Sequence, residues 1–384
     1  MKGKLSKNVI WMGVVSLLTD VSSEMIFPIL PLFLANILNA SKSAIGIIEG
    51  LAESTASILK VFSGWLSDKL NKRKAIIVFG YSLSTIMKPL FAVSTLWQYV
   101  LVIRFFDRFG KGTRDPPRDA LIAASTNKDV KGRAFGFHKM MDTIGAIIGT
   151  LAAFLLLAFA FNYRSIFWFS FIPGAIAVLV LIFFVKEIKN KVNNEIKLKE
   201  SFGREFKIFV LISSLFSLGN FSYAFFILKA QEFVQALFIP IIYLLYNVSY
   251  ALFAMPAGNL SDKFGRRNII AIGYILFGIV AFAFTVIANS IFAWVLFIFY
   301  GISIAFREAV SRAYVTDLVD KDKRATAFGV FYMANGLVMF PASIIAGKLW
   351  DIYGSNLVFL YASVISIISA VLLLLLLDKK LKNN

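Results

Sequence analysis

The sequence contains no cysteine and one histidine among 384 residues. Without cysteine there are no disulfides, no thiolate metal ligands and no cysteine nucleophile, and one histidine is too few for a histidine-rich metal site. We therefore expect no metal and no cofactor. Charged residues make up 16% of the chain and hydrophobic residues 59%, whereas soluble domains are about 45–50% apolar. A soluble enzyme is therefore not expected, and no nucleophile–base pair indicates a membrane enzyme.

Long apolar segments dominate the chain, and several approach the roughly 20 residues that a bilayer core requires. We predict an all-α integral membrane protein with twelve transmembrane helices in two six-helix bundles. The bundles are predicted at residues 1–185 and 206–384, with a charged cytoplasmic linker at 186–205. The helices are predicted near residues 8–37, 43–66, 74–94, 96–124, 133–160, 164–185, 206–230, 234–260, 268–287, 290–317, 325–348 and 354–377.

The net charge of +18 lies on every second loop. Basic residues open and close the chain and fill the linker, but none lies near residues 93–97 or 288–291. This distribution follows the positive-inside rule. It predicts a multi-pass protein of the cytoplasmic membrane that contacts lipid and has both termini in the cytoplasm. It also argues against nucleic acid as a partner. The N-terminal apolar run is too long for a signal peptide and is interpreted as the first transmembrane helix.

One ten-residue phrase occurs twice. Gly-Trp-Leu-Ser-Asp-Lys-Leu-Asn-Lys-Arg begins at residue 64, and Gly-Asn-Leu-Ser-Asp-Lys-Phe-Gly-Arg-Arg begins 194 residues later. Ala-Phe-Gly at residues 134–136 recurs at 327–329, and Arg114-Asp115 matches Arg307-Glu308. The chain is therefore predicted to be two tandem copies of one membrane unit, with the substrate path between them near the bilayer midplane.

The repeated phrase resembles the signature Gly-x-x-x-Asp-x-x-x-(Arg/Lys)-(Arg/Lys) of the major facilitator superfamily. The resemblance covers nearly the whole chain and implies a secondary transporter that works by alternating access, with a monomer able to transport. It also implies that Asp68 and Asp262 gate the protein by stabilising its outward-facing state. The signature residues are Gly64, Asp68, Lys72 and Arg73, and then Gly258, Asp262, Arg266 and Arg267.

Ionisable residues within the apolar segments are costly, so they indicate function. In the first helix Asp20 and Glu24 are spaced i,i+4, and such carboxylates can bind and release a proton during a transport cycle. The residues predicted to line the substrate path or gate are Glu49, Glu53, Arg108, Arg114, Arg118, His138, Asp142, Asn220, Tyr243, Asn247, Arg307 and Glu308.

The fourth helix contains Arg104-Phe-Phe-Asp107-Arg108. It is similar to the Arg-x-x-Gln-Gly motif of proton-coupled members of the family, although Asp107 and Arg108 replace Gln and Gly. We predict that Arg104 pairs with Asp20 or Glu24 and sets its protonation, with Asp107 in the same group. A static salt bridge between helices is the alternative.

Residues 110–119 contain two adjacent prolines and several charges. The segment lacks the Gly-Lys-Ser/Thr ending of a phosphate-binding loop, so no nucleotide site is predicted. Because proline removes helical hydrogen bonds, we expect a broken helix there, with Arg114 and Arg118 facing a gate or an anionic substrate.

The sequence thus predicts a transporter that uses a proton gradient to move a small organic solute. An exporter-like Phe-Pro-Ile-Leu-Pro run at residues 27–31 favours export, although the fifth helix lacks the proline of drug exporters. An uncoupled facilitator of the same fold and a transporter-like receptor or scaffold are the alternatives. The substrate, the direction and the titrating carboxylate stay open.

Overall fold

The computed structural model describes residues 5–70, 72–126, 130–188, 202–320 and 323–377, apart from the side chains of residues 65, 68 and 325. All regular secondary structure in these ranges is helical. The helices of the first half are α1 (Lys7–Glu24), α2 (Leu30–Asn36), α3 (Lys42–Leu70), α4 (Arg73–Val93), α5 (Trp97–Ala124), α6 (Lys131–Ala158) and α7 (Tyr163–Phe184). Those of the second half are α8 (Arg204–Gly219), α9 (Tyr223–Gln231), η2 (Ala236–Phe238), α10 (Ile239–Phe264), α11 (Arg266–Thr285), α12 (Ser290–Ile304), η3 (Ala305–Ala309), α13 (Val310–Asp317), α14 (Arg324–Tyr353) and α15 (Ser355–Leu376).

Each of the twelve predicted apolar segments corresponds to a helix or to consecutive helical pieces. The first segment is interrupted between α1 and α2, where Pro28 precedes a second proline at the start of α2. Polar residues begin several of the other helices: the side chains of Asn162 and Asn289 accept hydrogen bonds from the backbone N–H groups of Ser165 and Phe292. Such N-caps satisfy donors that a helix terminus leaves unpaired.

Nine helical segments within the described ranges are long and apolar enough to cross a membrane. Three long helices of the first half, α1, α3 and α5, are not among them. These helices contain the charged residues discussed above, because Asp20 and Glu24 lie on α1, Glu53 on α3 and Arg104 on α5. Counted with these three, the segments make up the predicted twelve-helix fold.

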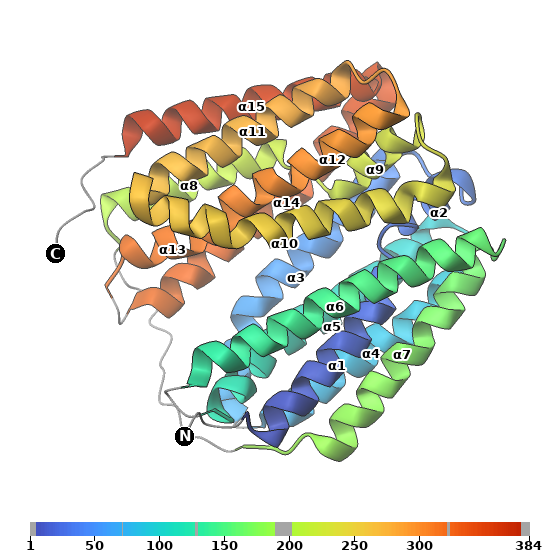
Figure 1. Cartoon of the computed structure of the whole chain (residues 1–384), viewed down its shortest axis with the longest axis vertical. Helices are drawn as coiled ribbons and strands as arrows, with labels where there is room; N and C mark the ends of the chain where they lie inside the picture. Colours follow the sequence, from blue (N-terminus) through green and yellow to red (C-terminus); the bar gives the residue numbers. More distant parts are fainter. Residues whose placement is uncertain (1–4, 71, 127–129, 189–201, 321–322, 378–384) are drawn as a thin grey trace. The chain divides into compact units, whose positions relative to one another are not determined.

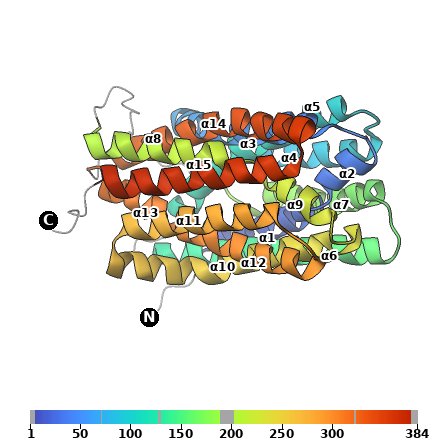
Figure 2. The same ribbon diagram turned by 90° about the horizontal axis from the view of Figure 1, so that it is seen from above.

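The chain divides into two compact units, of residues 1–40 with 51–196 and of residues 41–50 with 197–384. In the first unit α1 packs on α6 and α7, and α4 packs on α5 and α7 (Figure 1). In the second unit α8 packs on α14 and α15, and α11 packs on α12 and α15 (Figure 2). Helices that correspond in the repeat therefore pack on the same partners, as expected for two copies of one unit.

The start of α3 belongs to the second unit by its contacts, although the rest of α3 belongs to the first. Backbone N–H groups of Lys42 and Ser43 donate to the carboxylate of Asp351 at 2.9 and 2.8 Å. A β-carbon on Gly347 would lie 2.4 Å from the Lys42 carbonyl oxygen, so glycine permits this approach. The predicted boundaries did not anticipate this assignment, and most of the predicted linker lies outside the described residues.

Helix α5 corrects one prediction. The paired prolines, Pro116 and Pro117, lie inside a continuous α-helix rather than at a break. Its counterpart in the second half is the irregular one, because residues 305–309 form a π-helical turn between α12 and α13. Such turns in α-helices are frequent at functional sites.

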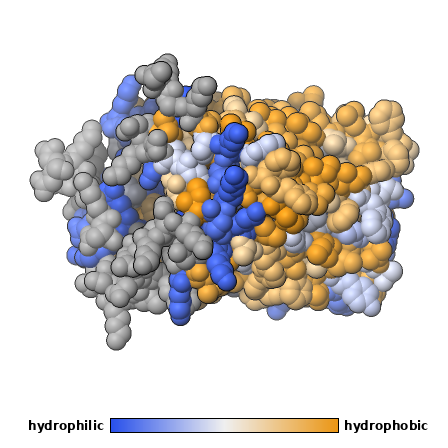
Figure 3. Space-filling view, turned by 90° about the horizontal axis from the view of Figure 1, so that it is seen from below, coloured by the Kyte–Doolittle hydropathy of each residue, from blue (hydrophilic) through white to orange (hydrophobic). Residues whose placement is uncertain are grey.

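Large apolar side chains cover much of the exposed surface, among them Phe62, Leu252 and Ile291. Figure 3 shows one face on which apolar residues form a broad area beside a more hydrophilic margin. A surface of this kind suits contact with lipid rather than with water.

Candidate functional site

Charged residues follow one side of α5 at intervals of three or four positions. Arg104 is completely buried, and Asp107, Arg108 and Arg114 are each less than 9% exposed. Residues at this spacing share a helix face. The helix therefore carries a stripe of buried charge, and each group in it needs a partner.

Arg104 lies at the start of this stripe. Its Nη1 atom is 3.4 Å from Oδ2 of Asp107, and its guanidinium carbon lies 4.9 Å from the centre of the Phe27 ring. Arg108 approaches the same ring, at 4.7 Å, and Lys111 at 6.0 Å, so three cations of α5 lie near one aromatic ring. The predicted pairing of Arg104 with Asp20 or Glu24 stays a prediction.

Arg108 joins α5 to α3. Its Nη2 atom lies 2.8 Å from Oε1 of Glu53, whose side chain is 28% exposed while that of Arg108 is 4% exposed. Close packing allows this contact, because a β-carbon on Gly112 would lie 2.8 Å from the Ala56 carbonyl oxygen. The structure thus brings together two residues that the sequence assigned to the substrate path without pairing them.

A second group of charges gathers near Pro116. Asp115 accepts from Arg118 at 3.4 Å and lies 3.8 Å from the Lys60 ammonium of α3. Arg114 donates to the hydroxyl of Ser84 at 2.9 Å and lies over the Tyr81 ring. Both predicted arginines are therefore held by groups of the first unit.

His138 and Asp142 lie on α6, at its interface with α1. The Ser16 hydroxyl of α1 donates to Oδ1 of Asp142, and Nδ1 of His138 lies 3.6 Å from the same oxygen. Asp20 borders this group, because a β-carbon on Gly145 would lie 3.0 Å from the Asp20 Cβ. Three predicted residues thus meet with Ser16, which the sequence analysis missed.

Lys88 of α4 is 2% exposed. Its ammonium donates to the hydroxyls of Ser22 and Ser23 at the end of α1. Ser22 in turn donates to the Ser170 carbonyl oxygen of α7. Within the described part of the chain no carboxylate lies within 4.0 Å of this ammonium, and serine hydroxyls accept its hydrogen bonds.

The second signature forms a charged network in the second unit. Arg266 at the start of α11 lies 3.3 Å from Asp262 at the end of α10, and it also pairs with Asp317 at the end of α13. Arg267 donates to carbonyl oxygens of Leu374 and Leu377 at the end of α15. The motif therefore joins four helix ends, while Gly258 lies in α10 with open space beside its Cα.

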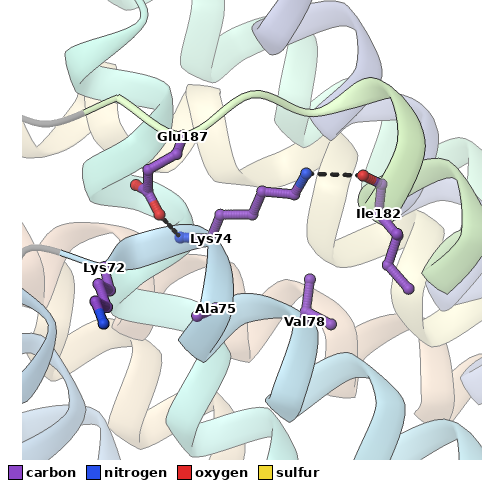
Figure 4. A pocket seen from close by; sticks show the side chains of 6 residues that line it. All are labelled: Lys72, Lys74, Ala75, Val78, Ile182 and Glu187. Carbon is purple, nitrogen blue, oxygen red and sulfur yellow. Dashed lines mark hydrogen bonds between the residues drawn. The ribbon is translucent and has the colours of Figure 1, made fainter.

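The first signature has a matching contact. Lys74, the second residue of α4 as Arg267 is the second residue of α11, donates from its side chain to the Ile182 carbonyl oxygen of α7 at 2.7 Å. Its backbone N–H donates to Glu187 at 2.8 Å, and Figure 4 shows both bonds around a small pocket that Lys72 also lines. Arg73 is buried, Gly64 contacts Pro116, and the Asp68 side chain lies outside the described part. Cations near helix C-termini are favourable, so each half uses one to hold its sixth helix.

The polar candidates of the second unit are a tyrosine among aromatic rings and two buried asparagine atoms. Tyr243 stands between Tyr223 and Tyr246, at 5.4 and 5.6 Å between ring centres. Oδ1 of Asn220 and Nδ2 of Asn247 are buried without a hydrogen-bond partner in the described part of the chain. Such atoms are uncommon in native structures and need an explanation.

Arg307 and Glu308 occupy the π-helical turn. Nη2 of Arg307 lies 3.6 Å from Oε1 of Glu308. The Arg307 guanidinium lies over the Phe216 ring at 4.9 Å. Glu49 is completely buried and lies in the part of α3 that groups with the second unit. Among the described residues no group of three or more histidine or carboxylate side chains is arranged to hold a metal ion.

Ser16, Asp317 and Asp351 were not among the residues predicted from the sequence, and neither was Lys74. Ser16 precedes Asp20 by one helical turn, a signal that was available. Asp317 and Asp351 lie near helix ends and gave no signal, because their partners are far away in the sequence.

Comparison with known proteins gives consistent results. The family model of the Major Facilitator Superfamily matches residues 12–239 and 208–384. An uncharacterized MFS-type transporter of Methanocaldococcus jannaschii is 43% identical, over 97% of this chain and 95% of its own. The multidrug resistance protein MdtG of Citrobacter koseri is 25% identical over 48% of this chain and 45% of its own.

Solved transporter structures are similar in fold. The nucleoside transporter NupG matches with a TM-score of 0.79 and 16% identity, over 95% of this chain and 98% of its own. A bacterial homolog of the human lysosomal transporter Spinster matches with a TM-score of 0.78 and 14% identity, over 96% of this chain and 95% of its own. At these identities the likeness concerns the fold alone.

Proposed function

Because the chain belongs to the Major Facilitator Superfamily of membrane transporters, we propose that it exports a small organic solute across the cell membrane in exchange for protons. Both termini would lie in the cytoplasm, and a single chain would be the transporting unit. The similarity to a multidrug resistance protein over about half of the chain and the exporter-like end of the first helix support export.

The observation that carries proton coupling is the buried charge of the first unit. Asp107, Arg108 and His138 are less than 9% exposed, and Asp20 lies beside Gly145, one turn from Asp142. Ionisable groups at membrane depth are expensive and mark ion pathways or proton relays. In this proposal Asp20 and Glu24 take up and release the proton, while Arg104 and Asp107 adjust their affinity for it.

The two signature regions would act as gates. Asp262, Arg266 and Asp317 join the ends of α10, α11 and α13, and an ion-pair network of this kind has discrete made and broken states. Asp68 would serve the same purpose in the first half. Glu49, Tyr243, Asn247 and the pair Arg307–Glu308 are proposed to line the substrate path.

The test is solute-dependent proton movement in proteoliposomes. A panel of amphiphilic cations, zwitterions and organic anions is added on either side, and a pH-sensitive dye reports proton flow. We expect at least one solute to move protons, with Asp20→Asn or Glu24→Gln reducing the signal at least tenfold. Opposite directions of solute and proton flow would establish export by exchange.

An uncoupled facilitator is the second candidate. Lys88 and Arg108 have partners that hold them in place, as static structural groups would. Solute flux with no proton movement would favour this function over the first. Binding of a solute without any flux would instead indicate a receptor.

A further inference from the structure

The proton site can be located more closely at the contact between α1 and α6. These helices run side by side through the first unit (Figure 1). Residue numbers rise together along the two helices from one contact to the next. Gly13 lies beside Phe137, Ser16 donates to Asp142, and Val21 lies beside Gly149. The helices are therefore parallel here, with small residues holding them close.

This register places two carboxylates one helical turn apart. Ser16 and Asp20 are spaced i,i+4 on α1, and Asp142 and Gly145 are spaced i,i+3 on α6. The Ser16 hydroxyl contacts Asp142, and Asp20 contacts the Gly145 position. Side chains on a helix tilt toward its N-terminus, so the Asp20 carboxylate leans toward Asp142, and the two interact electrostatically.

His138 completes the group from the next turn of α6. It is 4% exposed, its Nδ1 atom lies 3.6 Å from Asp142, and its buried Nε2 atom has no hydrogen-bond partner within the described ranges. Nδ1 can face Asp142 as a donor in the neutral ring and in the imidazolium, but only the imidazolium forms an ion pair with this carboxylate. The charge of the ring and the charge of the neighbouring carboxylates therefore depend on each other.

Other charges face the group from the surrounding helices. Asp20 interacts electrostatically with cations of α4 and α5, and His138 with charged side chains of α5; these residues are Lys88, Lys111, Arg114, Asp115, Arg118 and Asp119. Two carboxylates near each other titrate as a pair, and these cations set how strongly the pair holds a proton.

We propose that Asp20, Asp142 and His138, with Ser16 as hydrogen-bond donor, form one proton-binding site whose two carboxylates share a proton. This inference rests on the proposed proton coupling and moves the partner of Asp20 from Arg104 to α6. A proton from water forms an O–H bond with a carboxylate oxygen on one side of the membrane. The same bond breaks, returning the proton to water, on the other side.

The single histidine of the chain makes the site directly measurable. The full-length protein is labelled with ¹³C- and ¹⁵N-histidine, purified with a tag that contains no histidine and placed in lipid nanodiscs. One imidazole signal is then followed from pH 4 to pH 9. No substrate is needed.

We expect Asp142→Asn and Asp20→Asn each to move the midpoint of this titration by half a pH unit or more, because each carboxylate influences the ring's charge. Ser16→Ala is a milder change that keeps both carboxylates, and it should move the midpoint by a smaller amount even if an aspartate variant fails to fold. Glu187→Gln removes one charge of the same unit at the Lys74 contact and should leave the midpoint unchanged.

If the pH midpoint of the His138 titration is the same in Asp20→Asn as in the unsubstituted protein, the shared site is overturned. Only a local pair of His138 with Asp142 then remains. An equal response to Glu187→Gln would overturn the shared site as well. Transport separates this inference from the proposed function. Solute flux without proton movement in the unsubstituted protein refutes proton coupling, whereas proton movement that persists in Asp142→Asn refutes the inference alone.

Discussion

Corresponding helices pack in the same way in the two units, but the side chains buried between them differ in kind. Among the described residues, the buried aspartate, glutamate, lysine, arginine and histidine side chains of the first unit are Arg73, Lys88, Arg104, Asp107, Arg108, Arg114 and His138, and those of the second unit are Glu49 and Lys229. In their place the second unit has stacked rings. Phe226 stacks on Tyr300 at 4.3 Å, and Tyr300 stacks on Tyr246 at 5.0 Å.

The difference shows that the shared architecture does not depend on either kind of interior. Ion pairs hold α5 against α3 in the first unit, and aromatic contacts connect α9, α10 and α12 in the second. Most of the buried charge in the first unit therefore needs a reason other than folding, because the second unit folds in the same way with less of it. The proposed proton coupling would supply such a reason.

The largest expected effect lies in the aromatic interior. Phe226 is completely buried and contacts rings of α11, α12 and α15. Phe226→Ala should lower the free energy of unfolding by about 3–5 kcal/mol, as for other buried phenylalanines. Thermal unfolding in detergent measures this, with exposed Phe292→Ala as the control. A loss below about 1 kcal/mol would contradict a packing role for the rings.

The next effect tests the ion pairs of the first unit. Arg108→Ala should cost about 3 kcal/mol, because it leaves the partly buried Glu53 carboxylate without its cation. A double-mutant cycle with Glu53→Ala isolates the interaction, and the double variant should be more stable than Arg108→Ala alone. Simple additivity of the two losses would mean that this pair contributes nothing as a pair.

A smaller effect on stability is expected at the start of α3, where the Asp351 carboxylate accepts two backbone hydrogen bonds. Asp351→Ala removes the acceptor of the two N–H groups at the start of α3. A lost N-cap costs about 0.5–2 kcal/mol, and an exposed site belongs near the lower end. Asp320→Ala, which removes an exposed carboxylate paired within its own turn, is the control. Equal stability of the two variants would show that the contact with α3 is incidental.

The smallest effect on stability is expected for Lys88→Met, although its effect on transport should be large. Replacing a buried charge by an apolar group of similar volume is often neutral or stabilising. We expect the free energy of unfolding to change by less than about 1 kcal/mol and proton movement to fall. A strongly destabilised variant would assign Lys88 to the structure of the first unit instead.

The apolar segments and their repeat predicted the helices well, because both depend on composition along the chain. Arg108 and Glu53 were each chosen as site residues, but their pairing depends on how α3 and α5 are rotated, which no local pattern specifies. The prediction of a broken helix at Pro116 and Pro117 was wrong for a related reason. A proline pair in isolation disfavours a helix, but here the packing of α5 against α3 and α4 keeps it continuous.

The contact of Ser16 with Asp142 was also beyond the sequence. It follows from the close approach of α1 to α6 at Gly145 and Gly149, where a β-carbon would lie 2.4 Å from a carbonyl oxygen of α1. The spacing of Gly145 and Gly149 suits a close helix contact but does not specify which helix makes it. The π-helical turn at Arg307 gave no signal, since its residues also suit an α-helix.

The nearly constant spacing of the repeat implies an evolutionary constraint. Arg73 begins α4 and Arg266 begins α11, and Lys131 begins α6 and Arg324 begins α14, each 193 residues later. Side chains differ between the halves, while the starts of these two helix pairs keep the same spacing. One inserted residue would turn the rest of a helix by about 100°, carrying Arg108 away from Glu53. Charge and rings can therefore replace each other between the halves, whereas an insertion inside a helix would break contacts of this kind.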